Sequence, residues 1–120
     1  MQRRKDEELA ERFLDFTAKI INLVGGFPNT PVGKHIARQL VSSGTSPGAN
    51  YEEARGSESN ADFIHKLSVV LKELKESRYW LRVVRRIPLV SEETTTPLLD
   101  ECEQLIAIIG KSISTARKRK

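Results

Sequence analysis

Cysteine is nearly absent from this 120-residue sequence, since Cys102 is the only one, and no disulfide can therefore form within the chain. Cys102 stands in an apolar stretch, where we expect a small buried side chain rather than a reactive thiol. Long apolar runs are absent too, because none approaches the roughly 18 residues of a membrane span. The N-terminus lacks the apolar stretch of a secretory signal. These absences predict a cytoplasmic protein that makes no contact with a membrane.

Residues suited to catalysis or metal binding are also scarce. The chain has two histidines, and His65 ends its one Asp-x-x-His pattern, whereas a di-iron site in a helical bundle needs about two motifs of this type and further carboxylates. Zinc needs about three or four nitrogen or sulfur ligands. There is no Gly-x-Ser-x-Gly motif and no phosphate-binding glycine loop. We therefore expect no enzymatic activity, no catalytic residues, no metal and no cofactor.

What the sequence does contain is helical periodicity. Apolar residues recur at spacings of three and four, as in Leu9, Phe13, Phe16 and Ile20, which places them on one face of a helix. Short connections between helices favour antiparallel packing. We predict one all-α domain over residues 1–120, folded as an antiparallel up-down four-helix bundle. Glycines, prolines and capping residues set the helices at about residues 6–25, 31–55, 60–87 and 92–117.

The second helical segment has one stretch that periodicity alone does not assign. Residues 42–49 contain almost no large side chain, and Pro47 lies among them. One hypothesis is that this stretch is a loop. The other is a helix of small residues, kinked at Pro47, that lets a neighbouring backbone approach closely.

The third segment is apolar on more than one face. A heptad-like seam runs along it, with Ser77 as its one polar member, and further apolar residues lie off the seam. Such a helix is either central or shared with another subunit, and in a bundle this small we expect a subunit interface. The seam comprises Phe63, Leu67, Val70, Leu74, Leu81 and Val84, and the residues beside it are Ile64, Val69, Leu71, Trp80, Val83 and Ile87.

Basic residues give the chain a formal net charge of +4 and provide two candidate contacts for nucleic acid. One group follows helical spacing in the third segment, and the other ends the chain. Such groups contact phosphates without recognising bases, so binding to RNA or DNA should be sensitive to salt. The alternative is a solvated charged face, because Glu73 and Glu76 lie nearby. The candidates are Lys75, Arg78, Arg82, Arg85 and Arg86, and then Arg117, Lys118, Arg119 and Lys120.

A set of polar residues lies in the middle of the second and third segments, next to apolar positions. Buried polar groups need partners, and such residues often fix helix register or subunit contacts. Exposure at the surface is the alternative. We treat this set, together with Trp80, as candidates for a structural or interface role: Arg38, Gln39, Asn50, Glu53, Lys72 and Glu73.

Several short motifs in the second and third segments form a combination that is more specific than any one of them. They are Ala37-Arg38-Gln39-Leu40, Ser43-Gly44-Thr45-Ser46, Gly48-Ala49-Asn50, Glu53-Ala54, Ser59, Asp62-Phe63-Ile64-His65-Lys66-Leu67, Leu71-Lys72-Glu73 and Arg78-Tyr79-Trp80-Leu81. Through these motifs the chain resembles, over residues 8–116, a bacterial family of four-helix bundle proteins first described as reading frames within intervening sequences of large-subunit ribosomal RNA genes.

The resemblance implies a four-helix protomer that assembles into a homopentamer, with the stretch 42–49 helical. Pro47 departs from the family pattern, which usually has an aliphatic residue there, and this bears on the straightness of the helix. Relatives include the accessory protein of diversity-generating retroelements, a basic pentameric barrel that binds nucleic acid and a reverse transcriptase. No catalytic residues come with the family. We therefore predict a non-enzymatic oligomer that binds RNA or DNA. The alternative is an adaptor that scaffolds a protein partner.

Overall fold

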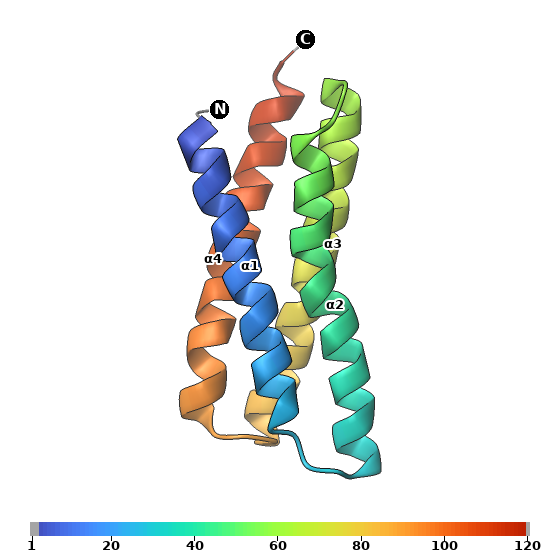
Figure 1. Cartoon of the computed structure of the whole chain (residues 1–120), viewed down its shortest axis with the longest axis vertical. Helices are drawn as coiled ribbons and strands as arrows, with labels where there is room; N and C mark the ends of the chain where they lie inside the picture. Colours follow the sequence, from blue (N-terminus) through green and yellow to red (C-terminus); the bar gives the residue numbers. More distant parts are fainter. Residues whose placement is uncertain (1–2, 120) are drawn as a thin grey trace.

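The computed structural model describes residues 3–119, and within them it has four α-helices and no strand. Figure 1 shows the helices side by side, each antiparallel to the one before it, in a molecule of 50 × 22 × 19 Å. The predicted all-α, antiparallel arrangement of four helices is confirmed. Arg3 already belongs to the first helix, and the third ends at Arg86 rather than residue 87. The helices are α1 (Arg3–Gly25), α2 (Pro31–Arg55), α3 (Asn60–Arg86) and α4 (Glu92–Arg117).

The turns before α2 and α3 end in side chains that cap the next helix. Thr30 Oγ1 accepts a hydrogen bond from the Gly33 amide at 3.0 Å, and Pro31 takes the first helical position, where a missing N–H is harmless. Ser59 Oγ accepts from the Asp62 amide at 3.1 Å. Each cap satisfies an amide that the first helical turn leaves without a backbone partner. The reversal of chain direction is therefore encoded locally at both turns.

The core is made of the helix faces that the periodicity predicts. Phe13, Phe16 and Ile20 of α1 are at most 1% exposed, and Leu74 and Leu105 are completely buried. Burial of each side chain of this size stabilises the fold by about 1.5–3 kcal/mol. No helix within residues 3–119 has the length and apolar character that a membrane crossing requires. The inner face of α4 is also buried, and it comprises Leu98, Cys102, Leu105, Ile109, Ile113 and Ala116.

Residues 42–49 are helical, so the hypothesis of a loop there is wrong. The small side chains are where α2 comes close to its neighbours: a Cβ atom on Gly44 would lie 2.8 Å from Cγ2 of Ile20, and one on Gly48 would lie 3.3 Å from Cβ of Phe13. On the α3 side, Ser77 Oγ donates to Ser43 Oγ at 3.2 Å in the buried core. Periodicity missed this helix because its buried positions are filled by small residues rather than by large apolar ones.

Polar contacts tie α1 to both of its neighbours. Arg12 makes two hydrogen bonds to Glu101 of α4, from Nε to Oε2 at 2.9 Å and from Nη2 to Oε1 at 2.7 Å. Near the start of α1, the Asp6 carboxylate accepts hydrogen bonds from the hydroxyl of the buried Tyr51 and from Nε of Arg55, the latter at 2.7 Å. Burial, and then the bond to Asp6, raises the pKa of Tyr51 above its ordinary value. These bonds fix the register of α1 against α2 and α4.

Two glycine-to-alanine substitutions test the close approach of α2. Gly110→Ala should raise the free energy of unfolding by up to about 1 kcal/mol, because alanine favours the helix and nothing lies within 4 Å of the added Cβ. Gly44→Ala gains the same helix propensity, but it must displace the buried Ile20. Its free energy of unfolding should therefore fall about 1–3 kcal/mol below that of Gly110→Ala, as measured by urea denaturation. Equal stability of the two variants would contradict the packing described here.

Candidate nucleic-acid interface

The basic side chains predicted to form one stripe on α3 do not all face solvent. Arg78 turns toward α4, where its Nη1 atom lies 3.0 Å from Oε1 of Glu103. This ion pair neutralises one charge of the stripe. The exposed members are Lys75, Arg82 and Arg86, and Arg85 is half-buried.

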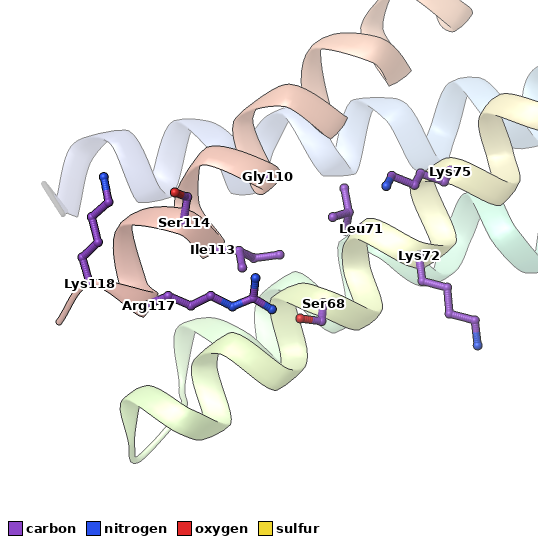
Figure 2. A pocket seen from close by; sticks show the side chains of 9 residues that line it. All are labelled: Ser68, Leu71, Lys72, Lys75, Gly110, Ile113, Ser114, Arg117 and Lys118. Atoms are coloured by element: carbon purple, nitrogen blue, oxygen red, sulfur yellow. The ribbon is translucent and has the colours of Figure 1, made fainter. Parts of the chain in front are cut away.

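A groove of about 700 Å³ lies between the middle of α3 and the last turns of α4. It brings together Lys72 and Lys75 from α3 with Arg117 and Lys118 from α4. Figure 2 shows Arg117 extending from α4 toward α3, while Lys72 and Lys118 point outward. Lys75 of the predicted α3 group thus lines one groove with Arg117 and Lys118 of the C-terminal group, and Lys72, which was not predicted as a nucleic-acid contact, joins them. We call this site the α3–α4 groove, and it is lined by Ser68, Leu71, Lys72, Lys75, Gly110, Ile113, Ser114, Arg117 and Lys118.

Small residues open this groove. A Cβ atom on Gly110 would meet nothing within 4 Å, so α4 stands away from other groups at this point. Ser68 and Ser114 face the gap from opposite helices, and the Ser68 hydroxyl donates to the Ile64 carbonyl at 2.8 Å. Leu71 and Ile113 supply the apolar part of the lining. The result is a concave surface with charges on both rims.

Among residues 3–119, the four basic residues of the α3–α4 groove form none of the ion pairs found in the structure. No Asp or Glu in this range contributes to the lining of the groove. The ion pairs found among residues 4–119 involve other basic side chains, namely Arg4, Arg12, Arg55, Lys66 and Arg78. A concave surface lined by charges of one sign attracts ligands of the opposite sign. The arrangement can therefore hold phosphate groups.

A second basic groove, of about 360 Å³, flanks the last turns of α4 beside α1. It is lined by Lys5, Lys111 and Arg119, together with Phe63 of α3 and other residues of α4. Lys111 was not among the predicted basic residues, although it stands seven residues before Lys118 and so shares a helix face with it. Lys120, which was predicted, lies outside the described residues.

The polar candidates of α2 and α3 do not form one cluster. Arg38 is exposed, and the Asn50 side chain donates to the Ser46 carbonyl within α2 at 3.0 Å. Glu53 is exposed, with its Oε1 3.9 Å from Nζ of Lys66. Gln39 and Glu73 are half-buried, and Lys72 lines the α3–α4 groove. A structural or interface role for this set remains a prediction.

Most of the apolar residues beside the α3 seam are used within the protomer. Ile64, Leu71, Trp80 and Val83 pack against the core, which weakens the argument for a subunit interface on α3. The large apolar side chains that remain exposed lie mainly on α1 and α2. They are Leu14, Ile21, Val32 and Val41, with Tyr79 and Ile87 on the α3 side.

Neither metal-binding clusters nor a reactive thiol appear in the structure. Within residues 3–119, no three side chains from His, Cys, Asp and Glu come together in a way that could hold a metal ion. The predicted burial of Cys102 is confirmed, and its Sγ donates to the Leu74 carbonyl at 3.3 Å. Burial raises the pKa of this thiol to about 12, so the nucleophilic thiolate is scarce at neutral pH.

Comparisons with known proteins agree with this architecture. The family model described as "23S rRNA-intervening sequence protein" matches residues 5–111. A crystal structure from Bacteroides thetaiotaomicron, of a protein with unknown function from the S23 ribosomal protein family, has a TM-score of 0.83 with this chain. Sequence identity is 32%, and the match covers 92% of this chain and 98% of that one. No curated protein sequence matches. The predicted resemblance is confirmed, and the chain belongs to the 23S rRNA-intervening sequence protein family.

Proposed function

We propose that this protein binds RNA or DNA in the cytoplasm, without catalysing a reaction, and that the α3–α4 groove is its principal contact. One observation carries the proposal. Lys72, Lys75, Arg117 and Lys118 line a single groove between two helices, and no Asp or Glu among residues 3–119 lines it. A polyanion is the partner whose charge complements such a surface.

The residue types favour phosphate over a single carboxylate ligand. The Arg117 guanidinium can donate two parallel hydrogen bonds to a phosphate, whereas the lysines act as point charges that follow a flexible backbone. Two cations on each rim match a chain of phosphates better than one small anion. Contacts from these cations to phosphates carry no information about base identity, so binding through this groove is expected to be weakly sequence-specific.

We also propose that the protein acts as a homopentamer, as the family resemblance implies. Support comes from the exposed apolar side chains of α1 and α2, since Leu14 and Ile21 are 59% and 53% exposed. They lie two helical turns apart on one face of α1, and Val41 is exposed on neighbouring α2. An assembly repeats each basic groove once per subunit, which raises avidity for a long polyanion without any new contact.

The alternative is an adaptor that scaffolds a protein partner, and the same exposed apolar residues favour it. Nuclease treatment of a captured complex distinguishes the two functions. A partner captured from lysate by an adaptor survives nuclease treatment, whereas a partner bridged by RNA or DNA is lost. Capture of a stoichiometric, nuclease-resistant partner together with no affinity for nucleic acid would favour the adaptor.

Loss of groove charge should weaken nucleic-acid binding and flatten its salt dependence. In a filter-binding titration from about 50 to 200 mM salt, the wild-type protein should retain RNA at the low end and lose affinity steeply. Lys72→Gln/Arg117→Gln removes two phosphate contacts. The slope of log K against log salt should therefore fall by about 1.4–1.8.

The matched control is Lys19→Gln/Lys34→Gln, which removes the same charge from exposed positions on α1 and α2. The control should retain a slope close to that of the wild type, because it removes no phosphate contact in the groove. Both double variants lose the same net charge, so a difference between them reports the groove alone. If both double variants lost RNA affinity and salt slope equally, net charge rather than the groove would account for binding. No retention by the wild type at about 50 mM salt would overturn the proposed function.

Release of Arg78 should strengthen binding. Glu103→Gln removes the carboxylate that holds Arg78 and frees one more cation beside the groove. Affinity for RNA at low salt should rise several-fold, and the slope should steepen by about 0.7–0.9. Glu11→Gln, an exposed position on α1, makes the same change in net charge and should have a much smaller effect. Identical gains from the two substitutions would argue that Arg78 makes no contact.

A further inference from the structure

The outward face of α3 carries one aromatic side chain among its cations. Tyr79 is 60% exposed, the most exposed of the large hydrophobic side chains. Lys75 precedes it by one helical turn, and Arg82 and Arg86 follow it by one and two turns. These three basic residues are exposed as well. An aromatic ring therefore stands in the middle of a basic face, where solubility alone would favour a polar residue.

A neighbouring ring holds Tyr79 in place. Tyr79 and Trp80 meet edge to face, with ring centroids 5.1 Å apart and planes at 79°. Trp80 is itself half-buried, packs against the core and lies edge-on to His35 of α2, with centroids 6.0 Å apart. The series His35, Trp80 and Tyr79 thus connects an exposed ring to the rigid part of the bundle. An aromatic ring held in this way loses little conformational entropy when a ligand packs on it.

The basic face is continuous with the α3–α4 groove. Lys75 belongs to both, and Lys72, one turn before Lys75, also lines the groove. Neighbouring turns of a helix rise by about 5.4 Å, so Lys75 and Arg82 each lie about one turn from Tyr79 along the axis. A polynucleotide whose phosphates contact these cations therefore passes beside the ring.

We propose that Tyr79 stacks on a base of a single-stranded polynucleotide whose phosphates follow Lys75, Arg82 and Arg86 into the α3–α4 groove. The inference rests on the proposed function and adds a preference for single strands over duplex. In a duplex both faces of each base are covered by neighbouring bases, whereas in a single strand they are accessible to an aromatic side chain. Stacking does not depend on base identity, so the preference is for strandedness rather than sequence.

The test measures fluorescence anisotropy with a labelled 20-nucleotide single strand and with a blunt 20-base-pair duplex, at about 100 mM salt. RNA and DNA versions of the single strand show whether the sugar matters. The variants are Tyr79→Ala, Tyr79→Leu, which retains apolar bulk without an aromatic face, and Tyr79→Phe, which retains the ring. Because Tyr79 is exposed, all three should fold, and circular dichroism with thermal melting checks this.

Loss of the ring should weaken single-strand binding by about 5-fold or more in both Tyr79→Ala and Tyr79→Leu. Tyr79→Phe should bind within about 2-fold of the wild type, since the phenyl face stacks equally well. None of the three should change duplex affinity by more than about 2-fold, because phosphate contacts alone carry it. As a second readout, emission from Trp80, the only tryptophan, should change when a single strand binds the wild type or Tyr79→Phe, and not when it binds Tyr79→Leu.

The outcomes separate this inference from the proposed function. Absence of binding to every oligonucleotide by the wild type defeats both. Binding that depends on Lys72 and Arg117 but is unchanged in Tyr79→Ala defeats the inference alone. If Tyr79→Ala lost affinity equally for the single strand and the duplex, the stacking inference would also be overturned, because stacking requires an accessible base face.

Discussion

The close approach of α2 to its neighbours is the constraint on which the rest of the structure depends. Gly44 faces Ile20 of α1, and Ser43 faces Ser77 of α3, so α2 fits between two helices with side chains no larger than a hydroxymethyl group at these points. Larger residues would separate the helices and expose the core. Helix α2 thereby fixes where α1 and α3 stand, and α4 packs against the surface that these two present.

The basic end of the bundle follows from helix direction and from charge. Arg117 and Lys118 close α4, where cations interact favourably with the partial negative charge of a helix C-terminus. This stabilisation of the cations by the helix C-terminus is local and would exist without any ligand. The same positions line the α3–α4 groove together with Lys72 and Lys75 of α3. The cations at the end of α4 are therefore stabilised by the helix itself, and they add positive charge to the groove without requiring a bound anion.

Sequence predicts the fold well because large apolar residues mark three helices, and Thr30 and Ser59 mark two turns. It failed to assign residues 42–49, since a helix packed through glycine and serine has no apolar period. The site was predicted less well. Lys75 and Arg117 line one groove only because antiparallel packing brings the middle of α3 beside the end of α4, and Arg78 pairs with Glu103 across the same boundary. Contacts of this kind depend on helix register, which a one-dimensional pattern does not contain.

The burial of Cys102 has a practical consequence for the study of this protein. Its thiol is enclosed by the core, and a pKa of about 12 leaves little thiolate at neutral pH. A maleimide or disulfide-forming probe therefore has no competing target in the native chain. A cysteine introduced on an exposed face of any helix becomes the sole attachment point for a fluorophore or spin label, without prior removal of the natural residue.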